Sequence, residues 1–222
     1  MPKANARDAK ELARLSTDCS FLLTHLVRQN DGRSDKDASA ILAKILDVAS
    51  RKAPKLKASK VGWYSSAAAK VFNPVTDEFD GTSSCEAICF TESTLMGLRA
   101  HRDVFGSKYG VAFDRDWLFG VGANPCLNIR ESLLKHTIMK AGKKYARHVY
   151  NFVPAQLHPY INIIHESFDA THEREWRHAG DLPFAYSNIR FVFCPENEFR
   201  TFSAVQSNGL PCLFDLAWLD RT

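Results

Sequence analysis

The chain has 222 residues, of which 45% are hydrophobic and 24% charged, a composition typical of a globular protein with one sizeable core rather than of a disordered segment. No apolar run reaches the length of a membrane span and the first residues lack the apolar core of a signal peptide, so we expect a cytoplasmic protein without membrane contact. The net charge of +4, spread over basic stretches at 7–14, 51–60 and 135–147, permits an anionic partner but is also typical of solvated surfaces.

The six cysteines are scattered and form no Cys-x-x-Cys pair. Reduced, buried thiols are therefore the preferred interpretation. A zinc site using Cys85, Cys89 and a histidine is an alternative, but alternation along a strand places both cysteine side chains on one face without any metal. We expect no metal.

The spacing of apolar residues predicts the secondary structure of the first 60 residues. Residues 2–16 predict an amphipathic helix, so that residues 1–17 form an accessory N-terminal element. Residues 18–28 predict a buried strand, with a helix as the alternative, and residues 37–52 carry the clearest helical pattern, capped by Ser34 or Asp35. The basic segment 51–60 is interrupted by proline and is expected to be a surface loop, which could also cover a site or touch nucleic acid.

Strand and helix signals alternate irregularly through the rest of the chain. Residues 85–91 predict a strand, and a helix capped by Ser93 or Thr94 follows and stops at Gly106. The remaining expectations are strands at 109–114, 125–129, 188–194 and 210–216, a turn at 117–119, helices at 130–149 and 154–168 with surface or satisfied histidines, and a helix starting at Pro195. This order favours one α+β domain over residues 1–222, with a mixed or mostly antiparallel sheet flanked by helices.

The stretch 171–178, Thr-His-Glu-Arg-Glu-Trp-Arg-His, has the pattern of a strand with chemistry on one face. Side chains alternate between the faces of a strand, so Glu173, Glu175 and Arg177 are expected to share one face. Two carboxylates beside a guanidinium favour a site that holds a hydroxyl group, stabilises positive charge or clamps an anionic group. A solvated edge strand with cross-strand ion pairs is the alternative.

Several motifs resemble, in order and spacing, the bacterial abortive-infection AbiG-type family of phage-defence proteins over residues 89–198. They are Cys89-Phe90-Thr91-Glu92-Ser93-Thr94-Leu95, His101, Tyr109-Gly110-Val111-Ala112-Phe113, Trp117, Gly122-Ala123-Asn124-Pro125 and Glu173-Arg174-Glu175-Trp176-Arg177. The layout is in turn similar to ADP-ribosyltransferases, in which an early strand supplies an arginine or histidine, a second strand a serine, threonine or tyrosine, and a late strand a glutamate. The resemblance implies an NAD-dependent mono-ADP-ribosyltransferase of a phage-defence or toxin–antitoxin system, with RNA, DNA or a protein as acceptor and a cognate antitoxin or toxin as partner.

The resemblance also implies roles for individual residues. The first element would be 24–28, in which Thr24 and His25 contact NAD, with His25 on the adenosine ribose. Phe90 and Thr91 would form the second element, with Thr91 near the nicotinamide ribose. The remaining implied residues are Arg28 and Arg177 for the pyrophosphate, Glu175 for the transition state and Glu173 for orienting the acceptor.

The chemistry agrees with these roles, because cleavage of the nicotinamide glycosidic bond builds positive charge on the ribose that a carboxylate stabilises. We therefore expect the strands carrying His25, Thr91 and Glu175 to be neighbours that open onto one cleft, flanked by the basic loop 51–60. Two alternatives stay open. One is a non-enzymatic antitoxin or sensor partner, in which Glu175 points into an ion pair. The other is a metal-dependent nuclease using Glu173, Glu175 and nearby histidines.

Overall fold

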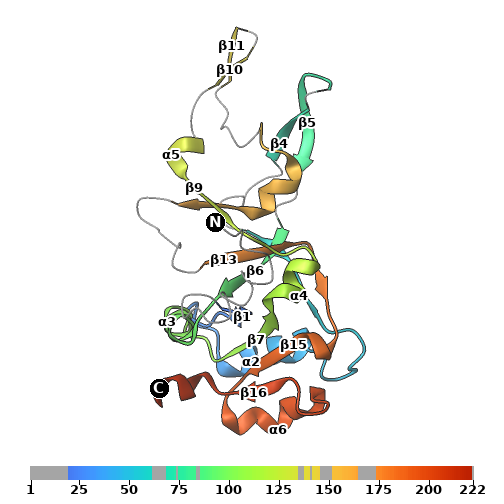
Figure 1. The fold of residues 1–222 in the computed structure, drawn as a ribbon, viewed down its shortest axis with the longest axis vertical. Coiled ribbons are helices and arrows are strands. Elements are labelled where there is room, and N and C mark those ends of the chain that lie inside the picture. The colour runs from blue at the N-terminus through green and yellow to red at the C-terminus, as the bar shows by residue number, and fades with distance from the viewer. Residues whose placement is uncertain are drawn as a thin grey trace, which may run out of the picture. The chain divides into compact units, whose positions relative to one another are not determined.

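A computed structural model of the chain describes residues 20–61, 69–73, 75–83, 86–134, 138–140, 142–145, 152–164 and 174–221 (Figure 1). Backbone contacts group the chain into two compact units. The first comprises residues 1–56, 90–122 and 183–222, and the second comprises residues 57–89 and 123–182. The single domain over residues 1–222 stays a prediction, and the helix predicted at 2–16 lies outside the described residues.

The first unit is built on a mostly antiparallel sheet whose strands follow the order β16, β15, β7, β1 and the end of β6. β1 (Leu22–Val27) and β7 (Tyr109–Asp114) pair antiparallel along their whole length. β15 (Ile189–Phe193) pairs antiparallel with β7, β16 (Cys212–Phe214) pairs parallel with β15, and β6 (Glu86–Glu92) pairs antiparallel with β1. The predicted α+β class with a mostly antiparallel sheet is confirmed.

Two long helices of the first unit begin at capping side chains that the sequence displays. α2 (Asp35–Ile45) follows Ser34, whose hydroxyl accepts from the Asp37 N–H, and α3 (Leu95–Phe105) follows Thr94, which accepts from the Gly97 N–H. α3 ends at Gly106 with φ 57°, a left-handed conformation that favours glycine. Its Leu98 packs into an apolar cluster with Leu26, Ala112, Phe193, Leu216 and Leu219.

Short helices complete the first unit. Residues 117–119, predicted as a turn, belong instead to the helix α4 (Arg115–Gly120), because Asp114 caps it by accepting from the Trp117 N–H. The remaining short helices are η5 (Tyr186–Asn188), η6 (Glu196–Glu198), α6 (Phe199–Phe202), η7 (Ser203–Val205) and η8 (Leu216–Arg221). The helix start expected at Pro195 is confirmed as a 3-10 turn that continues into α6.

One glycine of this sheet is fixed by a close approach between strands. A Cβ atom at Gly110 on β7 would lie 2.5 Å from the His25 carbonyl oxygen of β1. That distance is shorter than real Cβ contacts, so any larger residue would push the central strands apart.

The second unit contains short, mostly two-stranded pairings. β3 (Ser59–Lys60) pairs antiparallel with the start of β6, which is followed in strand order by β13 (Glu175–Ala179) and β8 (Asn124–Pro125). The other pairs are β4 (Ala69–Asn73) with β5 (Glu78–Ser83), β9 (Leu127–Arg130) with β12 (Ile161–Ile164), and β10 (Ile138–Lys140) with β11 (Lys143–Tyr145). β2 (Lys55–Leu56) belongs to the first unit, and the chain returns to that unit within β14 (Leu182–Pro183).

The helices predicted at 130–149 and 154–168 are wrong. Those ranges contain the end of β9, the short helix α5 (Glu131–Leu134), β10, β11, the 3-10 helix η3 (Ala155–Tyr160) and β12. β9 and β12 pair in a parallel ladder in which Ile163 is the register partner of Ile129, and Gly142 turns the chain with φ 74°. The strand expected at 125–129 is likewise split between β8 and β9.

Candidate functional site

Arg177 on β13 is held by hydrogen bonds from every nitrogen of its guanidinium group. Its side chain is buried, and its Nε and Nη2 atoms donate to Glu175 Oε1 at 2.9 Å and Oε2 at 3.0 Å. Nη1 donates to the carbonyl oxygens of Pro159 at 3.1 Å and Ile161 at 2.7 Å, and Nη2 also reaches Asn162 Oδ1 at 3.4 Å. A guanidinium group has five N–H donors, so all of them are used inside the protein.

This arrangement fixes the chemical state of the pair. Burial opposes the charge on Arg177, but the hydrogen bonds and charge of Glu175 outweigh it and raise the pKa of Arg177. Both carboxylate oxygens of Glu175 face the guanidinium in a fork-to-fork geometry. Arg177 thereby ties η3 and β12 to β13, and binding a pyrophosphate would require it to release those carbonyl groups.

Two half-buried thiols lie close to this pair. Burial, together with the negative charge of Glu175, raises the pKa of Cys89, so its thiol stays protonated and unreactive. Cys126 is in no disulfide, and its backbone N–H donates to the Glu175 carbonyl oxygen at 2.8 Å. Within the described ranges no group of three or more His, Cys, Asp or Glu residues is arranged to hold a metal ion. Glu173 and Cys85 lie outside those ranges.

Thr24 and Thr91, both predicted to contact NAD, do meet in the first unit. They are register partners on β1 and β6, and Thr24 Oγ1 donates to the Thr91 carbonyl oxygen at 3.2 Å. Thr91 Oγ1 lies 3.1 Å from His101 Nε2 of α3, a hydrogen bond between hydroxyl and imidazole. Both threonines are buried. The two hydroxyls thus join neighbouring strands to α3.

His25 and Phe90 lie on the opposite face of the same strands, because side chains alternate along β1 and β6. Their rings meet edge to face with centroids 6.0 Å apart. Arg28 is exposed, and its guanidinium lies 4.2 Å from the centre of the Phe105 ring. The structure therefore brings Thr24 to Thr91 and His25 to Phe90, but it separates His25 from Thr91.

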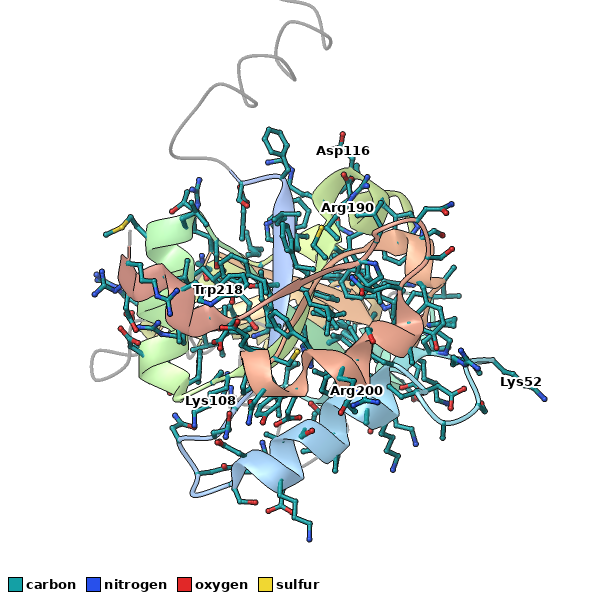
Figure 2. All side chains as sticks on the ribbon, turned by 90° about the horizontal axis from the view of Figure 1, so that it is seen from below. Lys52, Lys108, Asp116, Arg190, Arg200 and Trp218 are labelled. Atoms are coloured by element: carbon teal, nitrogen blue, oxygen red, sulfur yellow. The ribbon has the colours of Figure 1, made fainter. Side chains whose placement is uncertain are left out.

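The basic stretch 51–60 is exposed at each of its lysines and arginines. Lys52 extends away from the ribbon in Figure 2. The start of the stretch is held by Asp47, whose carboxylate accepts from the Ser50 hydroxyl and from the backbone N–H groups of Lys52 and Ala53. These hydrogen bonds lower the pKa of Asp47 to about 2. A role for the stretch in steering an anionic acceptor stays a prediction.

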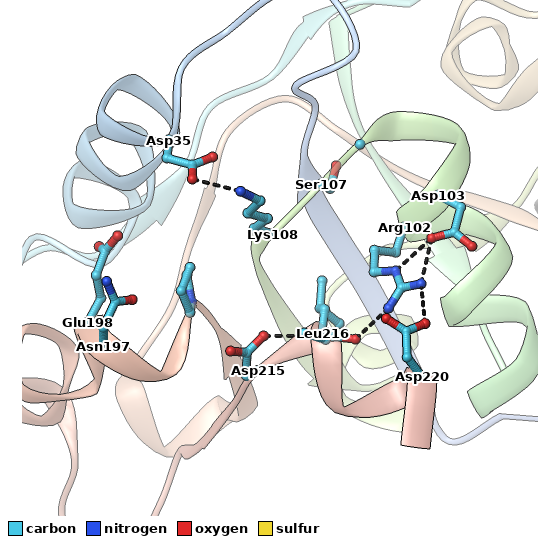
Figure 3. Close-up of a pocket in the computed structure, with 13 residues that line it drawn as sticks. Asp35, Arg102, Asp103, Ser107, Lys108, Asn197, Glu198, Asp215, Leu216 and Asp220 are labelled. Carbon is cyan, nitrogen blue, oxygen red and sulfur yellow. Dashed lines mark hydrogen bonds and ion pairs between the residues drawn. The ribbon is translucent and has the colours of Figure 1, made fainter. Parts of the chain in front are cut away.

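Sequence reasoning missed a charged pocket of about 730 Å³ in the first unit (Figure 3). Lys108 Nζ and Asp35 Oδ2 form an ion pair at 2.7 Å on one side. On the other side Arg102 donates to Asp220 Oδ1 and to the Leu216 carbonyl oxygen, both at 2.8 Å. The lining residues come from α2, α3, η6, η8 and the loops beside them, so no local motif could have revealed the pocket.

The carboxylates of this charged pocket are largely satisfied from within the unit. Glu198 accepts from the Tyr109 hydroxyl and, at 2.6 Å, from the Ser39 hydroxyl. Burial and the charge of Glu198 raise the pKa of Tyr109, which keeps that phenol protonated. Asp215 accepts from the backbone N–H groups of Glu196 at 2.9 Å and Ala217 at 2.8 Å. These hydrogen bonds indicate that Glu198 and Asp215 hold the local structure together.

Comparison with known proteins gives no relative: no family model, curated protein or solved structure matches this chain. Among the helices of the described ranges, none is long and apolar enough to cross a membrane. Function must therefore be argued from the geometry of the chain's own residues.

Proposed function

We propose that the chain acts as a non-enzymatic partner, an antitoxin or sensor subunit, in a phage-defence or toxin–antitoxin system. The observation that carries this proposal is the saturated pair on β13, in which Glu175 and Arg177 bind each other through two hydrogen bonds. The system type rests on the resemblance of the sequence motifs. The partner role rests on how Glu175 is used.

A carboxylate that stabilises a ribosyl cation must aim at the substrate. Glu175 instead has both oxygens on Arg177, and its side chain is only 10% exposed. Taking Glu175 away from Arg177 would leave a buried guanidinium without its counter-charge, which is strongly destabilising. The pair therefore supports a structural role for Glu175, as the non-enzymatic proposal requires.

The test is release of nicotinamide from NAD by the purified full chain, with DNA, RNA and protein acceptors supplied in turn. The partner proposal predicts no release above buffer by the wild type. Glu175→Gln should then change only stability, while Glu78→Gln, at an exposed glutamate of β5, serves as the matched control for handling. In cells, expression of the chain alone should leave growth unchanged. Release of nicotinamide that depends on Glu175 would overturn the proposal.

A second candidate, an NAD-dependent ADP-ribosyltransferase, is favoured by the pairing of two residues expected to contact NAD. Within the first unit, Thr24 and Thr91 are register partners on β1 and β6 and share one face of these strands. For this candidate, Glu175→Gln should keep NAD binding and lower turnover by about two to four orders of magnitude.

A further inference from the structure

A second, smaller pocket of about 220 Å³ lies in the first unit beside β1 and the start of α3. We call it the Ser93 pocket. Its walls include Leu22 and Thr24 of β1, Ser93 and Thr94 before α3, and phenylalanines of β15 and β16. None of these residues belongs to the charged pocket. The two pockets therefore offer different chemistry.

Aromatic rings form the apolar wall of the Ser93 pocket. Phe214 meets Phe191 at a centroid distance of 6.1 Å and an interplanar angle of 82°, and it meets Phe193 at 6.2 Å and 85°. Phe191 and Phe214 are only partly buried, so their surfaces remain available to an occupant. Edge-to-face and offset contacts of this kind favour another planar ring.

The polar end of the Ser93 pocket carries hydrogen-bond donors. The Ser93 residue is 8% exposed, and its hydroxyl oxygen is the one buried side-chain polar atom of the described ranges without a hydrogen-bond partner. Such a group costs free energy unless something pairs with it. Next to it, the backbone N–H groups of Leu95 and Met96 begin α3 and have no acceptor within the helix, and its first turn contains no acidic residue. Donors at a helix N-terminus favour a negatively charged group.

We propose that the Ser93 pocket binds a small aromatic carboxylate. The ring lies against the phenylalanine wall, and the carboxylate accepts hydrogen bonds from the start of α3 and from the Ser93 hydroxyl. That hydroxyl is closed off in the unliganded conformation, so it reaches the carboxylate by rotating about the Ser93 Cα–Cβ bond. An engineered apolar cavity of about 150 Å³ holds benzene, so a pocket of this volume accommodates a ring with one carboxylate. The proposal does not depend on the partner role, because it uses only residues of the first unit.

The experiment titrates benzoate into the full chain by calorimetry, with the amide resonances of Leu95 and Met96 followed by NMR. We expect saturable binding that shifts both resonances. Benzamide, which keeps the ring but lacks the charge, should bind more weakly. Ser93→Ala should weaken benzoate about tenfold, the size expected for loss of one hydrogen bond to a charged group. Ser207→Ala, at an exposed serine outside the pocket, is the matched control and should bind like wild type.

The proposal would be overturned by absence of saturable benzoate binding, by shifts that spare Leu95 and Met96, or by equal affinity of benzoate for wild type and Ser93→Ala. Equal affinity of benzoate and benzamide would also contradict it, because the α3 N-terminus then contributes nothing to charge recognition. Failure of the partner proposal would show instead as Glu175-dependent nicotinamide release, so the two failures are distinguishable.

Discussion

Two buried polar regions of this protein differ in how completely their hydrogen bonds are made. On β13 every donor of Arg177 has an acceptor within the protein, whereas beside α3 the Ser93 hydroxyl has none. A saturated buried group holds structure together, and an unsatisfied one costs free energy until a ligand pairs with it. The comparison therefore assigns stability to the Glu175–Arg177 pair and ligand binding to the Ser93 pocket.

The largest expected effect comes from breaking the saturated region at its centre. Arg177→Met removes the guanidinium that pairs with the buried Glu175 carboxylate and donates to the carbonyl oxygens of Pro159 and Ile161, so the free energy of unfolding should fall by about 3–5 kcal/mol. Urea unfolding measures it. Arg190→Met is the matched control. Arg190 is 45% exposed and forms a surface ion pair with Asp114 at 3.5 Å, so its loss should cost less than about 1 kcal/mol. Equal losses in the two variants would show that the buried hydrogen bonds of Arg177 contribute no more stability than a surface ion pair.

A second saturated group lies at the charged pocket. Tyr109 is fully buried and its hydroxyl donates to Glu198, so Tyr109→Phe should lower the free energy of unfolding by about 2 kcal/mol, as for a hydrogen bond to a charged acceptor. Tyr186→Phe removes a hydroxyl that donates to the neutral Leu46 carbonyl at 2.6 Å and should cost about 1 kcal/mol. Chemical denaturation of both variants ranks them. A larger loss at Tyr186 would show that the Glu198 contact is not the stronger bond.

Local patterns in the sequence predicted much of the first unit. A bounded apolar run marked β1, with a helix as the alternative, and strand patterns marked β6 and β7. The caps at Ser34 and Thr94 with the stop at Gly106 marked α2 and α3, because these signals act over a few residues. The helix predictions over residues 130–164 were wrong, since β9 and β12 form strands by pairing with each other although they lie far apart in the sequence. Propensity within a window cannot report such a partner.

The candidate site shows the same division. Alternation correctly placed Glu175 and Arg177 on one face of a strand, but the acceptors that saturate Arg177 lie 16 and 18 residues away, at Ile161 and Pro159. From the sequence alone, Arg177 was therefore predicted to be available for binding an anionic group. Alternation also separates His25 from Thr91, a consequence that follows only once the β1–β6 register is known. Ser93 was noticed as a cap, and its missing partner is a property of packing alone.

In the unsatisfied region the sign of the stability effect reverses. Ser93→Ala removes a buried hydroxyl that makes no hydrogen bond, so the unliganded protein should become more stable by about 1 kcal/mol. Thermal and urea unfolding without added carboxylates measure the change. Thr24→Ala is the contrasting variant, because the Thr24 hydroxyl donates to Thr91 and its loss should destabilise. A destabilised Ser93→Ala would mean that the hydroxyl already has a partner.

The smallest effect concerns a saturated carboxylate at the surface. Hydrogen bonds from Ser50, Ala53 and Lys52 lower the pKa of Asp47 to about 2, below its value in the unfolded chain. A depressed pKa stabilises the folded state above the unfolded pKa of about 4, and this contribution disappears as the pH falls toward about 2. NMR titration of the Asp47 carboxyl carbon should give a midpoint near that low value. A midpoint near about 4 would show that the loop bonds do not persist in solution.

The most direct test of the central claim is a double-mutant cycle on the pair itself. It compares the free energies of unfolding of wild type, Arg177→Met, Glu175→Leu and the double variant. The account predicts that the sum of the two single losses exceeds the loss in the double variant by about 2–3 kcal/mol, which is the coupling energy. The reason is that each single change leaves a buried charge unpaired, whereas the double change removes both charges. Additive losses, with a coupling near zero, would show that Glu175 is not committed to Arg177 and would return it to the candidates for chemistry.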